Sequence, residues 1–259
     1  MNDQELRRAE HAARAIELGL HLPPDAAISH ESAAILRGWS TYDVPAAVRV
    51  TRTRGNGFRT SDIHVHRAGM RPTDRDVAQG VPVTSAARTV IDLGRRLPFG
   101  QALVTADAAL RAGTSRQQLQ DVLRHQWTWP MVRRAMPVMR WADSRSESAL
   151  ESWTRSRFIT LRLPIPRLQQ DIVGEHGWVA RVDFLFDEYD VAGEADGRIK
   201  YLADELWAEK QRQDDIEDAG KEVIRWIWRT AHVPDEEFAR RLLRKLDRGL
   251  MLKRLRATA

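Results

Sequence analysis

Three acidic side chains in the second half of the chain have a spacing that could build a metal site. Alternating apolar residues predict a strand in which Val182 and Phe184 share one face and Asp183 lies on the other. In the next apolar segment Glu194 and Asp196 are two residues apart, so their side chains project from the same face of a strand. If the two strands form a hairpin, the three carboxylates converge on one face of the sheet.

Such a cluster of carboxylates indicates magnesium chemistry. Carboxylates packed together without a cation are costly or become protonated. Mg²⁺, or Mn²⁺ in its place, removes that cost because it is a hard ion that prefers oxygen ligands. Lys200 stands nearby in the sequence and could bind a phosphate group. A metal held in this way activates water and stabilises a reacting phosphate, so the pattern indicates hydrolysis of a phosphodiester bond.

The residues by themselves leave other interpretations open. The acids could be ordinary solvent-facing residues of an antiparallel sheet, or the remains of a site in an inactive protein. Glu151, on a predicted helix, is a further candidate, but Glu147 lies one helical turn earlier and either could be a surface acid.

The elements that must position these acids follow the order α-β-β-β-α-β-α. The predicted elements are a helix at about 147–161, strands at 168–174, 178–187 and 189–196, a helix at about 203–219, a strand at 223–228 and a helix from about 234 to 246, followed by a basic helical tail.

This half of the chain resembles the PD-(D/E)xK nuclease superfamily, and within it the branch related to very-short-patch-repair endonucleases. The motifs concerned are Ser148-Ala149-Leu150-Glu151, Arg181-Val182-Asp183 and Glu194-Ala195-Asp196-Gly197. The resemblance implies an α/β domain with a restriction-endonuclease-like α-β-β-β-α-β core and Mg²⁺-dependent hydrolysis of DNA. It also implies that Glu151, Asp183 and Glu194 are metal-site carboxylates.

The same resemblance suggests roles for the neighbouring polar residues. Asp196 occupies the position where the wider superfamily keeps its lysine, and it would help to complete the site or orient water. Lys200 would then stabilise the charge of the transition state. Lys210 and Arg212, in a segment that is also similar to that branch, are the secondary candidates for this positive charge.

The amino-terminal half is predicted to be a mixed α+β domain. The predicted elements are helices at about 2–19, 29–36, 85–97, 100–112 and 115–125, and strands at 44–50 and 63–66. Gly55 and Gly57 predict a hairpin between the two strands. The polar run at 143–146 predicts a boundary that gives domains 1–142 and 143–259.

The amino-terminal domain resembles AbiEi-type antitoxin proteins. The residues concerned are Ser29-His30-Glu31-Ser32-Ala33-Ala34, His64-Val65-His66-Arg67 and Pro82-Val83-Thr84-Ser85-Ala86-Ala87-Arg88-Thr89. The resemblance implies a regulatory or recognition domain. His30, His64 and His66 could be metal ligands, since His64 and His66 are two residues apart and share a strand face. A structural or surface role is the stronger prediction, because this pair lacks a convincing third ligand nearby.

Composition and charge restrict the function classes. The chain of 259 residues contains no Cys, which excludes disulfides, a thiolate zinc site and a cysteine nucleophile. No segment offers the roughly 18 uninterrupted apolar residues of a membrane helix, so we expect a soluble, cytoplasmic protein. The net charge is +5, yet residues 183–222 hold 14 acids against 5 bases. A basic body with one acidic stretch suits a phosphate-binding protein with a cation site, or simply one acidic helix.

Two functions therefore compete at the level of sequence. The first is a Mg²⁺-dependent DNA endonuclease, with an RNA-directed nuclease as a variant. The second is a non-catalytic AbiEi-like antitoxin or autoregulator that binds DNA or a cognate toxin with a nuclease-like fold. The amphipathic basic tail at 240–256 could contact phosphates, lie on an anionic membrane or cover the sheet, and the last is favoured.

Overall fold

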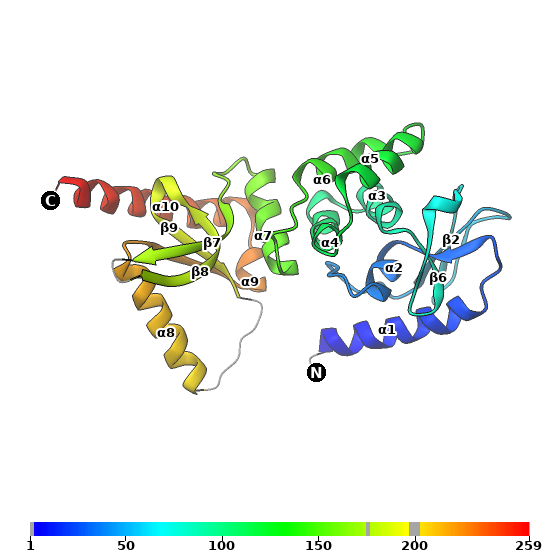
Figure 1. Cartoon of the computed structure of the whole chain (residues 1–259), viewed down its shortest axis with the longest axis horizontal. Coiled ribbons are helices and arrows are strands. Elements are labelled where there is room, and N and C mark those ends of the chain that lie inside the picture. Colours follow the sequence, from blue (N-terminus) through cyan, green and yellow to red (C-terminus); the bar gives the residue numbers. More distant parts are fainter. Residues whose placement is uncertain (1–2, 175–176, 197–202, 259) are drawn as a thin grey trace. The chain divides into compact units, whose positions relative to one another are not determined.

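The computed structural model describes residues 3–174, 177–196 and 203–258, and it divides into two compact units (Figure 1). Unit 1 is Met1–Ala149 and unit 2 is Leu150–Ala259, so the division falls later than the predicted 142/143. The reason is that the polar run at 143–146 is bonded to helix α4 (Phe99–Arg111). The backbone N–H of Asp143 donates to Asp107 Oδ1 at 2.8 Å, and Arg111 donates to the carbonyl oxygen of Ser146.

Unit 1 is built on a mixed sheet with the strand order β3-β4-β2-β1-β6-β5. The strands are β1 (Ala26–Ile28), β2 (Val48–Arg52), β3 (Phe58–Arg59), β4 (Ile63–Arg67), β5 (Arg75–Ala78) and β6 (Val81–Thr84). β1 pairs antiparallel with β2 and parallel with β6, while β5 and β6 form an antiparallel pair.

The hairpin predicted between the strands at 44–50 and 63–66 is wrong, because the corresponding strands β2 and β4 do not run antiparallel to each other. β2 and β4 pair in parallel, with Val50 opposite Val65. The chain reverses through the short strand β3, which is the antiparallel neighbour of β4. Two parallel strands need a crossover rather than a tight turn, and the segment between Arg52 and Ile63 provides it.

The remaining described α-helices of unit 1 are α1 (Asp3–Leu20), α2 (His30–Leu36), α3 (Ala86–Arg96), α5 (Arg116–His125) and α6 (Ala135–Trp141). α1 and α2 pack on the sheet, because Ala15 and Ala33 join Ile28, Val50 and Val83 in one buried cluster. α3 to α6 lie together as a helical group (Figure 1). Ser85 caps the start of α3: the Ser85 hydroxyl accepts from the backbone N–H of Arg88.

Unit 2 has the predicted order of elements, with one short additional helix, α9 (Trp228–Ala231), which begins where the sequence predicted the end of a strand. The elements are α7 (Ala149–Thr160), β7 (Arg167–Gly174), β8 (Gly177–Phe186), β9 (Val191–Ala195), α8 (Ala203–Asp218), β10 (Glu222–Trp226), α9 and α10 (Asp235–Thr258). The sheet order is β10-β9-β8-β7, antiparallel except for the parallel pair β9–β10. Both units are thus mixed α/β structures.

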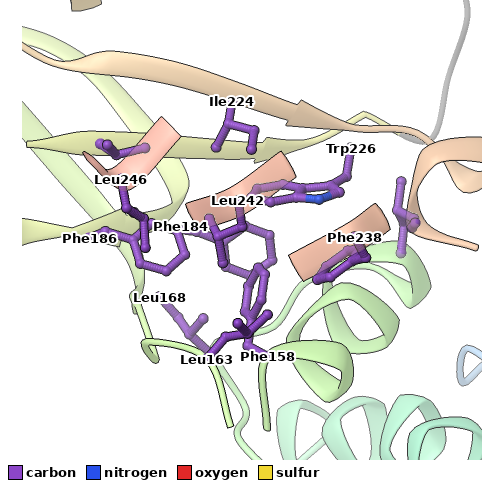
Figure 2. Packing of buried hydrophobic residues seen from close by; sticks show 13 residues of the cluster. Phe158, Leu163, Leu168, Phe184, Phe186, Ile224, Trp226, Phe238, Leu242 and Leu246 are labelled. Atoms are coloured by element: carbon purple, nitrogen blue, oxygen red, sulfur yellow. The ribbon is translucent and has the colours of Figure 1, made fainter. Parts of the chain in front are cut away.

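Helices cover both faces of the unit 2 sheet (Figure 1). Phe158 of α7 lies at the centre of the larger core, where its ring meets those of Phe184 and Trp226 edge-on, at centroid distances of 5.5 and 5.4 Å (Figure 2). Phe238 and Leu242 of α10 complete this face, so the first half of the basic tail covers the sheet. On the other face Ile216 of α8 packs with a second buried cluster.

The predicted face of Val182 requires correction. Phe184 belongs to the core beneath α7 and α10, whereas Val182 belongs to the cluster beneath α8, together with Leu185. Two residues that are two positions apart share a face only in a regular strand. The alternation of β8 is therefore interrupted at Asp183, which changes where this carboxylate lies.

Among the described helices, none combines the length and the apolar character that crossing a membrane requires.

Candidate functional site

Glu151 and Asp183 are brought together by a side chain that the sequence analysis did not single out. The Gln169 Nε2 atom donates to Glu151 Oε2 at 2.9 Å and to Asp183 Oδ1 at 3.0 Å. An amide nitrogen carries two hydrogens, so one Gln can serve both carboxylates at once. Helix α7 contributes Glu151 from its first turn, and strands β7 and β8 contribute the other two residues.

The backbone of Gln169 is unusual for a strand. Its φ of 52° lies in the left-handed region, which a residue with a Cβ adopts only at a cost. The neighbouring pairs Leu168–Phe184 and Gln170–Val182 are in register on either side of it. This local distortion coincides with the interruption of β8 at Asp183, and the two together direct both polar side chains to one point.

Asp183 also terminates the β8–β9 ladder. Its Oδ2 atom accepts the backbone N–H of Ala195 at 2.8 Å, beyond the last backbone pair, Phe184 with Gly193. The carboxylate thus takes the place of a backbone acceptor where the two strands separate. A group with this role is structural whatever else it does, because the N–H of Ala195 would otherwise need another partner.

Glu194 is held by arginines. It is 6% exposed, and its Oε1 atom forms an ion pair with Arg212 of α8 at 2.7 Å. Its Oε2 atom lies 3.5 Å from Arg225 of β10. A buried carboxylate needs such compensation, and the arginines supply it without a metal ion.

The other predicted residues are placed as follows. Asp196 is exposed, and its backbone N–H donates to the carbonyl oxygen of Trp226 at 2.8 Å. Lys210 is exposed on α8, and Arg212 contacts Glu194 in the ion pair just described. Lys200 and the neighbouring Gly197 lie outside the described residues.

These donors fit a divalent cation only in part. Glu151 and Asp183 are two hard oxygen ligands at one point, which is the protein share that Mg²⁺ usually takes. The third predicted ligand, Glu194, forms ion pairs with two arginines, and its role as a metal ligand stays a prediction. Within the part of the chain that the structure describes, no group of three or more acidic, His or Cys side chains could hold a metal ion.

Gln169 and Arg225 are the residues of this site that the sequence analysis missed. No local signal marked them: a Gln in a strand and an Arg between apolar residues are both common on a half-buried sheet. Only the pairing of β7 with β8, and of β10 with β9, brings them to the acids.

In unit 1 the three histidines stack instead of converging on a point. The His66 ring lies 4.2 Å from that of His30 and 4.1 Å from that of His64, with interplanar angles of 32° and 29°. Burial and the nearby arginines lower the pKa of His30 well below its usual value. Burial and the two neighbouring histidines lower the pKa of His66 to about 2. Both rings are therefore neutral at pH 7.

Unit 1 contains the part of the chain that matches a known family model. Residues 26–138 match the family model of the AbiEi antitoxin C-terminal domain. This match supports the resemblance that the motifs of the amino-terminal half predicted. The nuclease resemblance of unit 2 stays a prediction.

Two relatives from Mycobacterium tuberculosis, one each from the CDC 1551 / Oshkosh and H37Rv strains, bear names that describe them only as uncharacterized proteins. Each is 31% identical over 171 residues, which amounts to 65% of this chain and 63% of the relative.

Proposed function

We propose that this protein is an AbiEi-like antitoxin that binds DNA through unit 1. The observation that carries the proposal is the match of residues 26–138 to the AbiEi antitoxin C-terminal domain. The proposed role is regulatory rather than catalytic: the protein binds the DNA of its own control region and a cognate toxin.

The distribution of charge supports unit 1 as the DNA-binding part. Residues 1–149 contain 21 basic and 15 acidic side chains, a balance of +6, whereas residues 150–259 contain 20 and 21, a balance of −1. Every basic residue of unit 1 is Arg. Arg forms bidentate bonds to phosphate, and neutralising phosphates supplies most of the affinity of sequence-independent binding.

The segment between β2 and β4 is the best candidate for a phosphate-contacting surface. Arg54, Phe58 and Arg59 are all exposed there, Phe58 by 48%. Arg52 lies over the Phe58 ring at 5.8 Å, which holds the aromatic side chain against the loop. Exposed arginines beside an exposed aromatic ring are typical of a surface that binds nucleic acid, where the arginines contact phosphates and the ring stacks on a base.

A gel-shift titration tests the proposal. The probe is DNA from upstream of the protein's own reading frame, with EDTA present to exclude metal-dependent binding. We expect a complex that weakens with salt, and the Arg54→Gln/Arg59→Gln variant should lower the log–log salt slope by about two, since each phosphate contact contributes about 0.9.

Arg244→Gln, which removes one exposed arginine of unit 2, is the control and should leave the slope unchanged. Absence of a shift, or equal slopes for all proteins, would contradict DNA binding by unit 1.

Toxin binding has its own test. The product of the adjoining reading frame is co-expressed with the tagged full-length chain and purified through the tag. We expect a stable complex and relief of any growth defect that the neighbour causes alone. If the neighbour's product does not co-purify and its growth defect is not relieved, the antitoxin part of the proposal is contradicted.

A metal-dependent nuclease is the second candidate, favoured by the Glu151–Gln169–Asp183 cluster. Glu151 and Asp183 would hold Mg²⁺ or Mn²⁺, and the ion would supply an activated water and a Lewis acid for a phosphodiester. Glu194, Asp196 and Lys200 remain predicted contributors to the same reaction. The cluster supports this candidate because two acids around one amide, Glu151 buried and Asp183 half-buried, are costly to maintain for packing alone.

Plasmid nicking distinguishes the two candidates. Nuclease activity predicts nicking that requires Mg²⁺ or Mn²⁺ and falls by at least about a hundredfold in Asp183→Asn, as expected when a metal ligand is lost. Asp187→Asn is the matched control, because the exposed carboxylate of Asp187 forms a surface ion pair with Arg167, away from the cluster. Residual nicking that is equal in all variants would point to a contaminating nuclease and would exclude this candidate.

A further inference from the structure

Unit 1 contains a cavity of about 260 Å³ whose lining is rich in arginine and histidine. The side chains that matter here are His30, His66, Arg67, Arg88, Arg95 and Arg96. They come from the start of α2, from β4 and from α3, so three elements converge on the cavity. Its volume is slightly below the about 300–1,000 Å³ of typical sites for drug-sized ligands.

The exposure of the arginine side chains increases from the interior of the cavity to its mouth. The Arg88 side chain is 0% exposed, that of Arg95 is 17% exposed and that of Arg96 is 34% exposed. Trp129 fixes the inner two, since its ring centroid lies 4.8 Å from the Arg88 guanidinium carbon and 5.0 Å from that of Arg95. Such prior ordering lowers the entropic cost of binding a ligand.

Arg88 has bonding capacity to spare. Its Nε atom donates to Asp92 Oδ2 at 2.6 Å, and its Nη1 atom donates to the Gly69 carbonyl oxygen at 2.8 Å. Within the described part of the chain, its buried Nη2 atom has no hydrogen-bond partner. A buried guanidinium with an unmet donor is costly, and an acceptor that enters the cavity would remove that cost.

Positive charge is in excess around the cavity. Arg67, Arg88, Arg95 and Arg96 line it together with one carboxylate, Asp92. Asp74 lies 3.4 Å from Arg88, and Glu31 contacts Arg96 only at 3.8 Å. The histidines carry no positive charge at pH 7, so the rings of His30 and His66 can offer neutral N–H donors without requiring counter-ions.

Two residues that line the cavity have left-handed backbones. His30 has φ 51° and Met131 has φ 63°, although neither is Gly. Residues held in this region of φ/ψ space tend to cluster at ligand sites, where the surrounding structure maintains them.

We propose that this cavity is a binding site for a phosphomonoester, with Arg88 and Arg95 on its inner wall and Arg67 and Arg96 at its mouth. A terminal phosphate carries a charge of about −1.5 to −2 at pH 7 and three acceptor oxygens, which several arginines can share. A backbone phosphodiester has a single charge and remains embedded in its strand. The proposal therefore concerns a terminal phosphate and does not depend on DNA binding by unit 1.

Calorimetric titration of the full-length protein with inorganic phosphate tests the proposal, at an ionic strength held constant with chloride. We expect saturable binding with one site per chain. Arg96→Gln and Arg67→Gln should each weaken it by about tenfold, the usual loss of a charge-assisted hydrogen bond. Both residues reach the surface, so these variants should fold even if Arg88→Gln does not.

Arg133→Gln is the matched control: Arg133 is exposed and does not line the cavity, so phosphate affinity should not change. Two further titrants distinguish the sources of the phosphate, a nucleoside 5′-monophosphate and a short oligonucleotide with or without a 5′-phosphate. Tighter binding of either phosphorylated molecule than of inorganic phosphate supports the proposal and identifies the source. No saturable binding of any of the three, or equal affinity in wild type and Arg96→Gln, would overturn it.

Discussion

His11 and His30 are ionisable side chains enclosed in unit 1, only 0% and 7% exposed. His11 Nε2 shares a hydrogen bond with Ser32 Oγ at 2.8 Å, and the Ser29 hydroxyl bonds His30 Nδ1 at 2.9 Å. Burial, followed by the charge of Arg14, lowers the pKa of His11 to about 4. Both residues are thus maintained neutral by the fold, whereas in the unfolded chain each would titrate near pH 6.5.

This difference in pKa predicts acid sensitivity. Below about pH 6.5 the unfolded chain binds protons that the folded chain rejects, so stability falls as the pH falls. Above that pH the histidines are neutral in both the folded and the unfolded chain, so they no longer lower the stability. At about pH 5, each histidine that stays neutral in the fold costs up to about 2 kcal/mol in the free energy of unfolding.

Urea denaturation at about pH 7.5 and pH 5 measures the effect. His11→Asn should be less stable at both pH values but should lose less stability between them than the wild type. The lowered pKa of Asp74 contributes nothing in this window, because carboxylates titrate near pH 4. An unchanged pH dependence in His11→Asn would show that His11 is not a source of it.

Helix α10 can pack on the rest of unit 2 only where its backbone closely approaches the neighbouring 3₁₀ turn and strand β9. Gly249 lies in the middle of the helix, buried against the 3₁₀ turn at Asp187–Tyr189 and strand β9. A Cβ at this position would collide with the carbonyl oxygen of Tyr189 and would lie 2.7 Å from Val191 Cγ2. The helix can cover the sheet only because this residue has no side chain.

Helix propensity alone would therefore predict the wrong sign for the effect of Gly249→Ala on stability. Propensity predicts a gain of about 1 kcal/mol, whereas overpacking against a backbone oxygen costs about 1–3 kcal/mol. We expect net destabilisation of unit 2, measured as a lower midpoint of chemical denaturation. Arg244→Ala, an exposed position of the same helix, should change stability by no more than about 0.5 kcal/mol. A stabilised Gly249→Ala protein would mean that α10 does not pack as described.

At the scale of the whole chain, the acidic stretch and the basic tail largely compensate each other within unit 2. Lys221 binds Asp190 at 2.7 Å, and Lys253 of α10 approaches the same carboxylate at 3.3 Å. Lys245 of α10 binds Glu222 at 2.6 Å. The charge asymmetry along the sequence is thus partly structural, and the uncompensated positive charge belongs to unit 1. This division favours unit 1 for polyanion binding and restricts what can be inferred from net charge alone.

The order of elements in unit 2 could be predicted from the sequence, because hydrophobic periodicity and helix-ending residues are local signals. The alternation of Val191, Gly193 and Ala195 with Glu194 was predicted for the same reason and holds in β9. Asp183 stood out by its place in the strand pattern and Glu151 by the family resemblance; their role as metal ligands stays a prediction.

Partners and pairing directions did not follow, since they join residues far apart in the chain. The parallel pairing of β2 with β4, the bridge from Gln169 to two carboxylates and the arginines around Glu194 leave no local pattern. The arginine-lined cavity of unit 1 is of the same kind, because α2, β4 and α3 meet there only after folding. Residue type determines which chemistry a side chain can perform, and the long-range packing of the sheet and its helices selects the side chains that perform it together.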